Sequence, residues 1–212
     1  MANISLFSAK KIAGSGCAFE AHNKAEAWST LWLLVFMKSL RVEDVVVIDE
    51  SGCRIGMIPL YARAPRGCRA FDCAIRNYGQ NLTLLASLSI SGKQAAMTLE
   101  GVVDELAFET FVQRVLLPTL RPGQIVIMDN LSSHKTDKVE QLITSVECQL
   151  VFLPAYSPDL SPIEEAFSKL KAFSRRCRCQ TIPDLIQAIA QGLGKITAND
   201  AKGWFAHAGF SV

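Results

Sequence analysis

Long hydrophobic runs are missing from this sequence of 212 residues. The longest, from Leu31 to Met37, is far shorter than the roughly 20 apolar residues that a helix needs to cross a bilayer. The sequence also lacks internal repeats, low-complexity tracts and a Gly/Ser linker long enough to separate two globular parts. Because 50% of the residues are hydrophobic, the chain can bury a sizeable core. These features predict one large domain with no membrane span.

Three further features are absent, and each argues against a class of protein. No secretory leader and no C-x-x-C pair accompany the seven cysteines, an odd number, so we expect reduced thiols in a cytosol. No G-x-x-x-x-G-K-[ST] loop occurs, which argues against a nucleotide-hydrolysing enzyme. Cys177 and Cys179 lie close in sequence, but one such pair without two further ligands is poor evidence for zinc.

A large excess of positive charge is also lacking. The formal net charge is +2, which does not by itself indicate a nucleic-acid partner, although local clusters can still form a basic face. One cluster, Arg63, Arg66 and Arg69, flanks a predicted turn. A second cluster follows Glu164 along a predicted helix and comprises Lys169, Lys171, Arg175, Arg176 and Arg178.

Hydrophobic periodicity predicts an α/β chain. A β-branched run at 45–48 and an apolar run at 125–128 are typical of strands buried on both faces, and they end at Asp49 and Asp129. Further strands are expected at 55–61, 70–75, 82–90 and 150–153, the first three as an antiparallel meander. Helices are expected at 25–40, 105–117, 135–145, from Ser161 onward, at 182–193 and at 198–208.

Three carboxylates occupy positions from which they could meet at one edge of this sheet. Asp49 and Asp129 each follow a buried strand, and Glu164 lies in the first turn of the helix that begins after Ser161 and Pro162. Carboxylate oxygens suit Mg²⁺ or Mn²⁺, and two such ions can activate both oxygens of a phosphodiester displacement. A water or a DNA 3′-hydroxyl would then serve as the nucleophile.

Each of these carboxylates also has a simpler interpretation. Asp49 and Asp129 could be turn residues after strands, and Glu164 could close a capping box with Ser161. Three neighbouring acids could replace a member of the triad as ligand: Glu50, Asp159 and Glu165. Spacing alone does not decide between these alternatives.

Motif context favours the metal site. The segments Val-Val-Val-Ile-Asp49-Glu-Ser-Gly, Tyr61-Ala-Arg-Ala-Pro-Arg-Gly, Met-Asp129-Asn-Leu-Ser-Ser-His-Lys and Leu153-Pro-Ala-Tyr-Ser-Pro-Asp-Leu-Ser-Pro-Ile-Glu164 occur in this order. Together they resemble the mariner-like transposases of bacterial insertion sequences, which are DDE superfamily endonucleases similar to retroviral integrases. The 34 residues between Asp129 and Glu164 agree with that family. The resemblance runs from about residue 45 to 210.

The resemblance implies a fold, a site and a reaction. It implies a ribonuclease-H-like fold, with a five-stranded mixed sheet flanked by helices, over residues 41–212. It implies that Asp49, Asp129 and Glu164 bind two Mg²⁺ or Mn²⁺ ions and catalyse cleavage and strand transfer of double-stranded DNA at element ends. The bacterial cytoplasm is the expected compartment, and the expected partners are element-end and target DNA.

Residues 1–40 differ from the start of full-length relatives, which carry helix-turn-helix modules. This atypical, partly helical segment supplies no complete module of that kind. The chain could therefore work as a homodimer or with a separate helix-turn-helix subunit. It could equally be a truncated or split-frame fragment that binds DNA or a partner without autonomous activity, and a third reading is a nuclease of the same fold with no joining step.

Several polar residues have less specific roles. Asn130 could hydrogen-bond near the metals or close a turn, and His134 could orient a phosphate or a metal-bound water or be structural. Lys171 and Arg175 lie seven and eleven residues after Glu164, on its helical face, where they could hold DNA phosphates. The other candidate DNA contacts are Arg63, Arg66, Lys135, Lys169 and Arg176, for all of which a solvated surface is the alternative.

Overall fold

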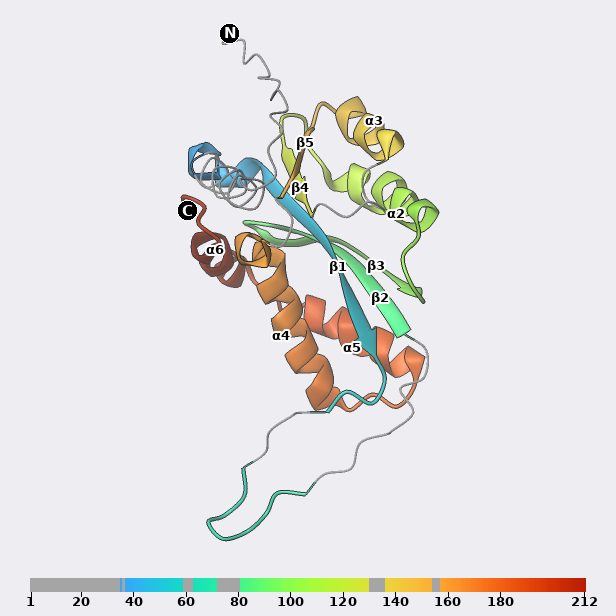
Figure 1. The fold of residues 1–212 in the computed structure, drawn as a ribbon, viewed down its shortest axis with the longest axis vertical. Helices are drawn as coiled ribbons and strands as arrows, with labels where there is room; N and C mark the ends of the chain where they lie inside the picture. The colour runs from blue at the N-terminus through green and yellow to red at the C-terminus, as the bar shows by residue number, and fades with distance from the viewer. Residues whose placement is uncertain (1–34, 36, 59–62, 72–80, 130–135, 154–156) are drawn as a thin grey trace, which may run out of the picture.

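A mixed sheet forms the centre of the computed structural model, which describes residues 35, 37–58, 63–71, 81–129, 136–153 and 157–212 (Figure 1). The sheet has five strands in the order β3-β2-β1-β4-β5. β1 pairs antiparallel with β2 and parallel with β4. The strands are β1 (Val45–Arg54), β2 (Asn81–Ser89), β3 (Gly92–Glu100), β4 (Ile125–Met128) and β5 (Gln149–Phe152).

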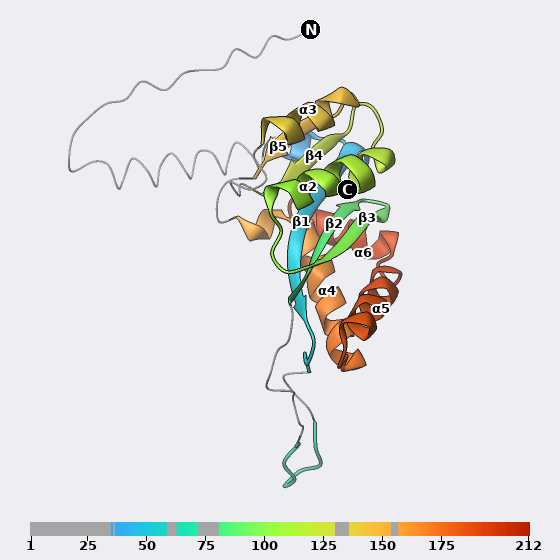
Figure 2. The same ribbon diagram turned by 90° about the vertical axis from the view of Figure 1, so that its right-hand side faces the viewer.

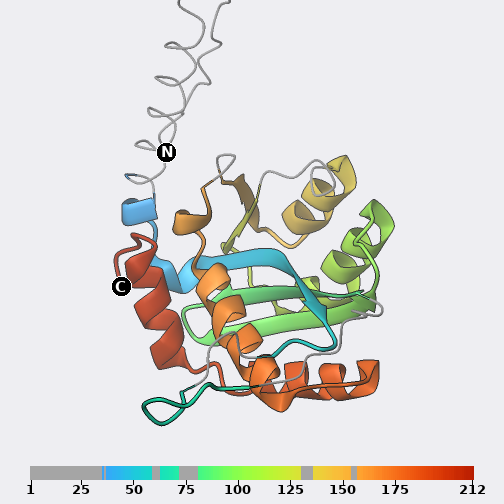
Figure 3. The ribbon, with the colours of Figure 1, turned by 60° about the horizontal axis from the view of Figure 1, so that its bottom comes forward.

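Helices cover both faces of the sheet (Figure 3). One hydrophobic core joins β1 and β2 to the C-terminal helices α4 (Pro162–Cys177), α5 (Ile182–Leu193) and α6 (Ala198–His207). A second core lies on the other face, beneath α2 (Glu105–Phe111) and α3 (Asp137–Ser145). α2 continues as a π-helix, Val112–Leu116, and a 3-10 turn, Leu117–Thr119. This arrangement confirms the predicted five-stranded mixed sheet flanked by helices.

The antiparallel part of the sheet differs from the sequence prediction. The described part of the expected strand at 55–61 forms a turn and extended chain, and β1 instead runs on to Arg54. The third antiparallel strand is β3, which the prediction missed. Its sequence includes Lys93, Gln94 and Glu100, and much of it is only partly buried, so it shows no continuous apolar run. An edge strand of this kind is recognised by its pairing with β2 rather than by hydrophobicity.

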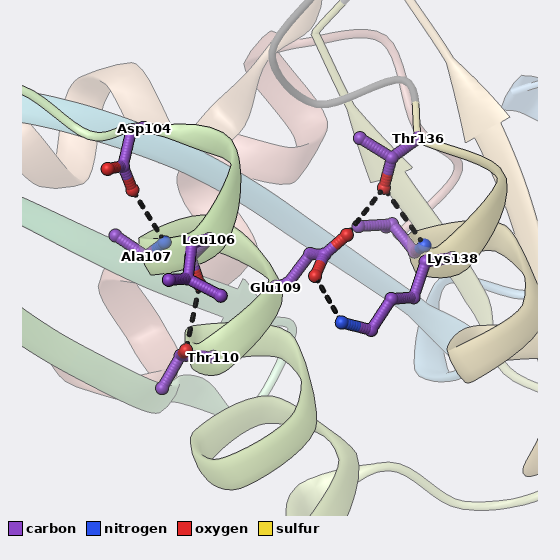
Figure 4. A network of polar contacts seen from close by, with 8 residues as sticks. Asp104, Leu106, Ala107, Glu109, Thr110, Thr136 and Lys138 are labelled. Carbon is purple, nitrogen blue, oxygen red and sulfur yellow. Dashed lines mark hydrogen bonds and ion pairs between the residues drawn. The ribbon is translucent and has the colours of Figure 1, made fainter.

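A buried carboxylate ties α2 to α3 (Figure 4). Glu109 of α2 accepts hydrogen bonds from Lys138 Nζ at 2.5 Å and from Thr136 Oγ1 at 3.4 Å. Thr136 is also the N-cap of α3, where its side chain accepts from the Val139 amide. The helix predicted from residue 135 therefore begins at Asp137.

Among the described helices, none is both long enough and apolar enough to pass through a lipid bilayer. The expected helix at 25–40 falls mostly outside the described residues. Its described end is helical through Ser39, and Met37 is fully buried in the core that α4 and α6 share.

Candidate active site

Strand register brings the two aspartates side by side. Ile48 of β1 pairs with Met128 of β4 in the parallel ladder, and Asp49 and Asp129 are the next residue on each strand. β4 ends at Met128, whereas β1 continues to Arg54 along β2. Asp49 therefore lies inside β1, which extends beyond the end of β4. The sequence had predicted that Asp49 lies at a strand end.

Side-chain alternation directs both aspartates toward the same face of the sheet. Val47 and Cys53 of β1 pack into the core beneath α4, and Asp49 shares their phase because alternate strand residues face the same side. Ile127 of β4 packs into that core as well, which gives Asp129 the same phase. The face of the sheet covered by α4 is therefore the face of the candidate site.

Glu164 reaches the site from the first turn of α4. Pro162 occupies the start of the helix and Ser161 its N-cap, but Ser161 makes no side-chain cap hydrogen bond. The capping box is the alternative role for Glu164, and it requires a hydrogen bond to the Ser161 side chain that is not formed. The Glu164 side chain is exposed, and α4 packs against β1.

The negative charges of neighbouring carboxylates act on Asp49. The pKa of Asp49 is raised from 3.8 to about 7, chiefly because the carboxyl group is buried. The negative charges of Glu164, Asp129 and Glu50 raise it further, in that order. A hydrogen bond of 2.7 Å from the Glu50 amide to Asp49 Oδ1 opposes the shift. This is a concentration of negative charge of the kind that a divalent cation would neutralise.

The carboxylate oxygens suit a hard cation, but they are not arranged as a complete set of metal ligands. Within the described part of the chain, no three His, Cys, Asp or Glu side chains stand close enough together to hold a metal ion. The coupled carboxylates Asp49, Asp129 and Glu164 supply oxygen ligands only, which is the set that Mg²⁺ and Mn²⁺ prefer. The residues therefore fit the metal by chemistry, with Glu164 as the exposed and adjustable member.

Two basic residues of α4 line a cavity beyond the carboxylates. Burial raises the pKa of the Cys53 thiol, and the nearby Lys171 ammonium opposes that shift, which places Lys171 beside β1. Lys171 and Arg175 line a cavity of about 470 Å³ together with Glu50 and Thr83. The helical face that the sequence assigned to Lys171 and Arg175 is thus the face turned toward the end of β1.

The neighbouring acids have other surroundings. Glu50 lines the cavity of Lys171, and its charge also acts on Asp49. Asp159, Glu164 and Glu165 line a second hollow of about 380 Å³. Glu165 Oε1 lies 2.7 Å from His207 Nδ1 on α6. Glu164 and Asp129 therefore differ from Glu50 in acting on Asp49 from separate elements of the fold.

Lys169 has a partner within the protein. Its ammonium lies 2.6 Å from Asp200 Oδ2 on α6 and 5.9 Å from the centre of the Trp204 ring. DNA contact by Lys169 stays a prediction. Sequence reasoning missed the pairing of α4 with α6. The only signal available was spacing, because Glu165 and Lys169 are four residues apart on one helical face.

The remaining predicted contacts lie in the segment 63–71, near the end of α4, or outside the described residues. Arg63 and Arg66 are exposed in the segment 63–71, which projects from the end of the molecule where β1 and α4 end (Figure 1). Arg176 is exposed near the end of α4. Three predicted residues, Asn130, His134 and Lys135, lie outside the described residues.

Comparison with known proteins adds a family and a fold. A family model described as DDE superfamily endonuclease matches residues 44–186. No curated protein sequence matches the chain. The fold is similar to that of the Mos1 transposase paired-end complex with the left transposon end, with a TM-score of 0.71, 14% identity, and coverage of 99% of this chain and 63% of that one.

Two further Mos1 structures are similar. The Mos1 strand transfer complex has a TM-score of 0.70 at 16% identity, and the match covers 97% of this chain and 62% of that one. The Mos1 catalytic domain with raltegravir and Mg has a TM-score of 0.62 at 14% identity, with 88% of each chain covered. The chain thus spans under two thirds of the longer Mos1 chains and most of a catalytic domain.

Proposed function

Because the chain belongs to the DDE superfamily of endonucleases, we propose that it is the catalytic domain of a DNA transposase. It would cut DNA at the ends of an insertion sequence in the bacterial cytoplasm and join the freed 3′-hydroxyl to target DNA. The fold supports this proposal, since the similar structures include Mos1 complexes with transposon-end DNA and after strand transfer. The order of the four motifs along the sequence supports it independently.

The observation that carries the proposal is the register of β1 and β4, which brings Asp49 and Asp129 side by side, with the Glu164 charge acting on Asp49. We propose that these three carboxylates hold two Mg²⁺ or Mn²⁺ ions. The ions, when bound, would activate the attacking oxygen and stabilise the leaving oxygen of the phosphodiester. Mos1 catalytic domain structures with Mg and with Mn support the choice of metal.

Each carboxylate contributes differently. Asp49 must lose the proton that its raised pKa retains near neutrality, so metal loading should strengthen as the pH rises through about 7. Asp129 is placed beside it by the strand register. Glu164, exposed on the first turn of α4, would turn toward the two aspartates to complete the ligand set.

The DNA backbone would follow the basic end of the molecule. Lys171 and Arg175 line the cavity beside β1, and the segment with Arg63 and Arg66 projects from the same end (Figure 1). Arg176 adds charge near the end of α4. Although the whole chain carries a net charge of only +2, this end gathers cations that can hold phosphates leading toward the carboxylates.

The proposed partner on element-end DNA is a second copy of the chain or a separate helix-turn-helix subunit. The similarity to a Mos1 paired-end complex supports binding to element ends. A binding assay with element-end DNA, with and without such a subunit, tests this part of the proposal.

The triad is tested by removing one carboxylate charge at a time. We expect Asp129→Asn and Glu164→Gln to reduce Mn²⁺-dependent nicking by about a thousand-fold or more, because each removes a ligand that stabilises transition-state charge. Asp159→Asn, at an exposed carboxylate near Glu164, is the matched control and should leave nicking unchanged. Normal nicking by both triad variants would refute the assignment.

A precut substrate separates cutting from joining. With a 3′-hydroxyl end supplied, a transposase domain should yield strand-transfer product, whereas a nuclease of the same fold should yield none. A chain that binds a partner and DNA, yet neither nicks nor joins with Mn²⁺, would be a non-catalytic fragment.

A further inference from the structure

Two contacts join α6 to α4 immediately after Glu164. His207 Nδ1 lies 2.7 Å from Glu165 Oε1, and Lys169 Nζ lies 2.6 Å from Asp200 Oδ2. The α4 partners are four residues apart and the α6 partners seven, so each pair follows one face of its helix. The two helices run antiparallel between these contacts. We call the pairs Glu165–His207 and Lys169–Asp200 the α4–α6 bracket.

The α6 side of the bracket is firmly fixed. Asp200 closes a capping box with Thr197, accepting from its amide at 2.9 Å and its hydroxyl at 2.7 Å. Hydrogen bonds from Lys169 and then Thr197 lower the pKa of Asp200 to about 2, so the carboxylate stays charged in neutral solution. Ala201 and Phe205, on the inner face of α6, are fully buried in the core beneath β1.

The α4 side depends on its partners. Glu165 Oε2 is buried and has no hydrogen-bond partner among the described atoms, so His207 supplies a contact to a carboxylate that is otherwise poorly solvated. The Lys169 ammonium lies over the ring of Trp204 on α6. Loss of either pair would leave one end of this helix contact held by packing alone.

The bracket contributes little to folding. The side chains of Lys169 and Asp200 are 39% and 27% exposed, and those of His207 and Glu165 are 77% and 36% exposed. Ion pairs with such exposure add little to stability because solvent screens them. Their geometric effect is larger: two contacts one helical turn apart on α4 resist its rotation and its sliding against α6.

Rotation of α4 would move Glu164 relative to the sheet. Asp49 is held by strand pairing and Asp129 directly follows Met128, the last paired residue of β4, whereas Glu164 is exposed on the helix. Metal ligands tolerate displacements of only about 0.5 Å from productive geometry. We propose that Lys169 and His207 are positioning residues, which hold α4 so that Glu164 can share metal ions with the aspartates; this rests on the proposed function of the triad.

The test compares charge-removing and conservative variants of the full chain. Lys169→Met keeps the aliphatic stem and Lys169→Arg keeps the charge; His207→Ala removes the donor and His207→Asn keeps a nitrogen near the Nδ1 position. Binding of Mn²⁺ is measured by calorimetry and by the rise in melting temperature during a Mn²⁺ titration. Nicking is measured over the same Mn²⁺ range, and DNA affinity over a range of salt.

We expect Lys169→Met and His207→Ala to raise the Mn²⁺ concentration for half-saturation by about 10-fold, as removal of groups that orient metal ligands commonly does. Without metal, their melting temperatures should change by less than about 4 °C. The conservative variants should resemble the unmodified chain. If Lys169→Met does not fold, His207→Ala measures the same bracket alone.

Two results would overturn the inference. Unchanged Mn²⁺ half-saturation in both charge-removing variants would show that the bracket does not position Glu164. Reduced DNA affinity for Lys169→Met, with a smaller salt dependence and normal Mn²⁺ binding, would instead make Lys169 a phosphate contact. Failure of the proposed function is distinguishable, because Asp129→Asn and Glu164→Gln would then nick normally.

Discussion

Replacement of Asp49 by Asn should stabilise the protein at alkaline pH while abolishing metal-dependent nicking. Asn preserves the shape of the side chain and the acceptor for the Glu50 amide, which lies 2.7 Å from Asp49 Oδ1. It removes the charge that burial, Glu164 and Asp129 disfavour. The substitution therefore relieves a folding cost and deletes a proposed metal ligand at once.

The size of the effect follows from the two pKa values. An Asp whose pKa is 3.8 in the unfolded chain and about 7 in the folded protein binds more protons when folded between those values. Stability is thus highest below the unfolded pKa and falls as the pH rises through the folded pKa. At 1.36 kcal/mol per pH unit, the cost is about 1.7 kcal/mol at pH 5 and about 4 kcal/mol at pH 8.

Urea unfolding in EDTA at these two pH values measures this cost. Asp49→Asn should gain about 2 to 3 kcal/mol more at pH 8 than at pH 5. Asp159→Asn, at an exposed carboxylate, should change stability by less than about 0.5 kcal/mol at either pH. Addition of Mn²⁺ at pH 8 should stabilise the unmodified chain and not Asp49→Asn. An equal gain at both pH values, or a loss at pH 8, would refute the electrostatic account of the site.

Two other predictions concern the helices around the site. A Cβ at Gly192 would clash with Leu170 Cδ1, so Gly192→Ala should lower stability by about 1 to 3 kcal/mol in thermal unfolding. Gly203→Ala, with nothing within 4 Å of the added Cβ, should raise stability slightly. A loss of stability from Gly203→Ala would contradict this packing argument. Lys171→Met with Arg175→Met should reduce the salt dependence of DNA binding by about two phosphate contacts, and an unchanged slope would exclude the cavity from the DNA path.

The central strands could be predicted because their residues are buried on both faces. The run from Val45 to Ile48 is fully buried, and Ile125 to Met128 is nearly so, so each gives a continuous apolar signal. β3 could not be found in this way, because Gly92–Glu100 lies at the sheet edge with many half-exposed residues. Its position is set by pairing with β2, a contact between separate segments that composition does not reveal.

The sequence proposes the members of the candidate site, whose metal-binding role stays a prediction, but it does not give the geometry of the site. The ends of the apolar runs identified Asp49 and Asp129, although β1 continues past Asp49 because its pairing with β2 extends to Arg54. Their common face follows from the parallel register of β1 and β4, which the sequence does not contain. The partner of Lys169 could not be inferred, since Asp200 lies 31 residues further along the chain and meets it only when α6 packs on α4.

The charge distribution around Glu164 explains why such a site can exist in a stable fold. Asp49 is fixed by backbone pairing and carries the cost of burial among like charges, which strand pairing and two hydrophobic cores must offset. Glu164 is exposed to solvent, which screens part of its charge, although that charge still raises the pKa of Asp49. If both Asp49 and Glu164 were buried, the repulsion between their charges would destabilise the folded protein in the absence of metal. Because Glu164 lies on a helix held by the α4–α6 bracket, the geometry of the proposed metal ligands can change with little effect on the stability of the fold. Lys169→Met should therefore alter the ligand geometry while leaving the stability nearly unchanged.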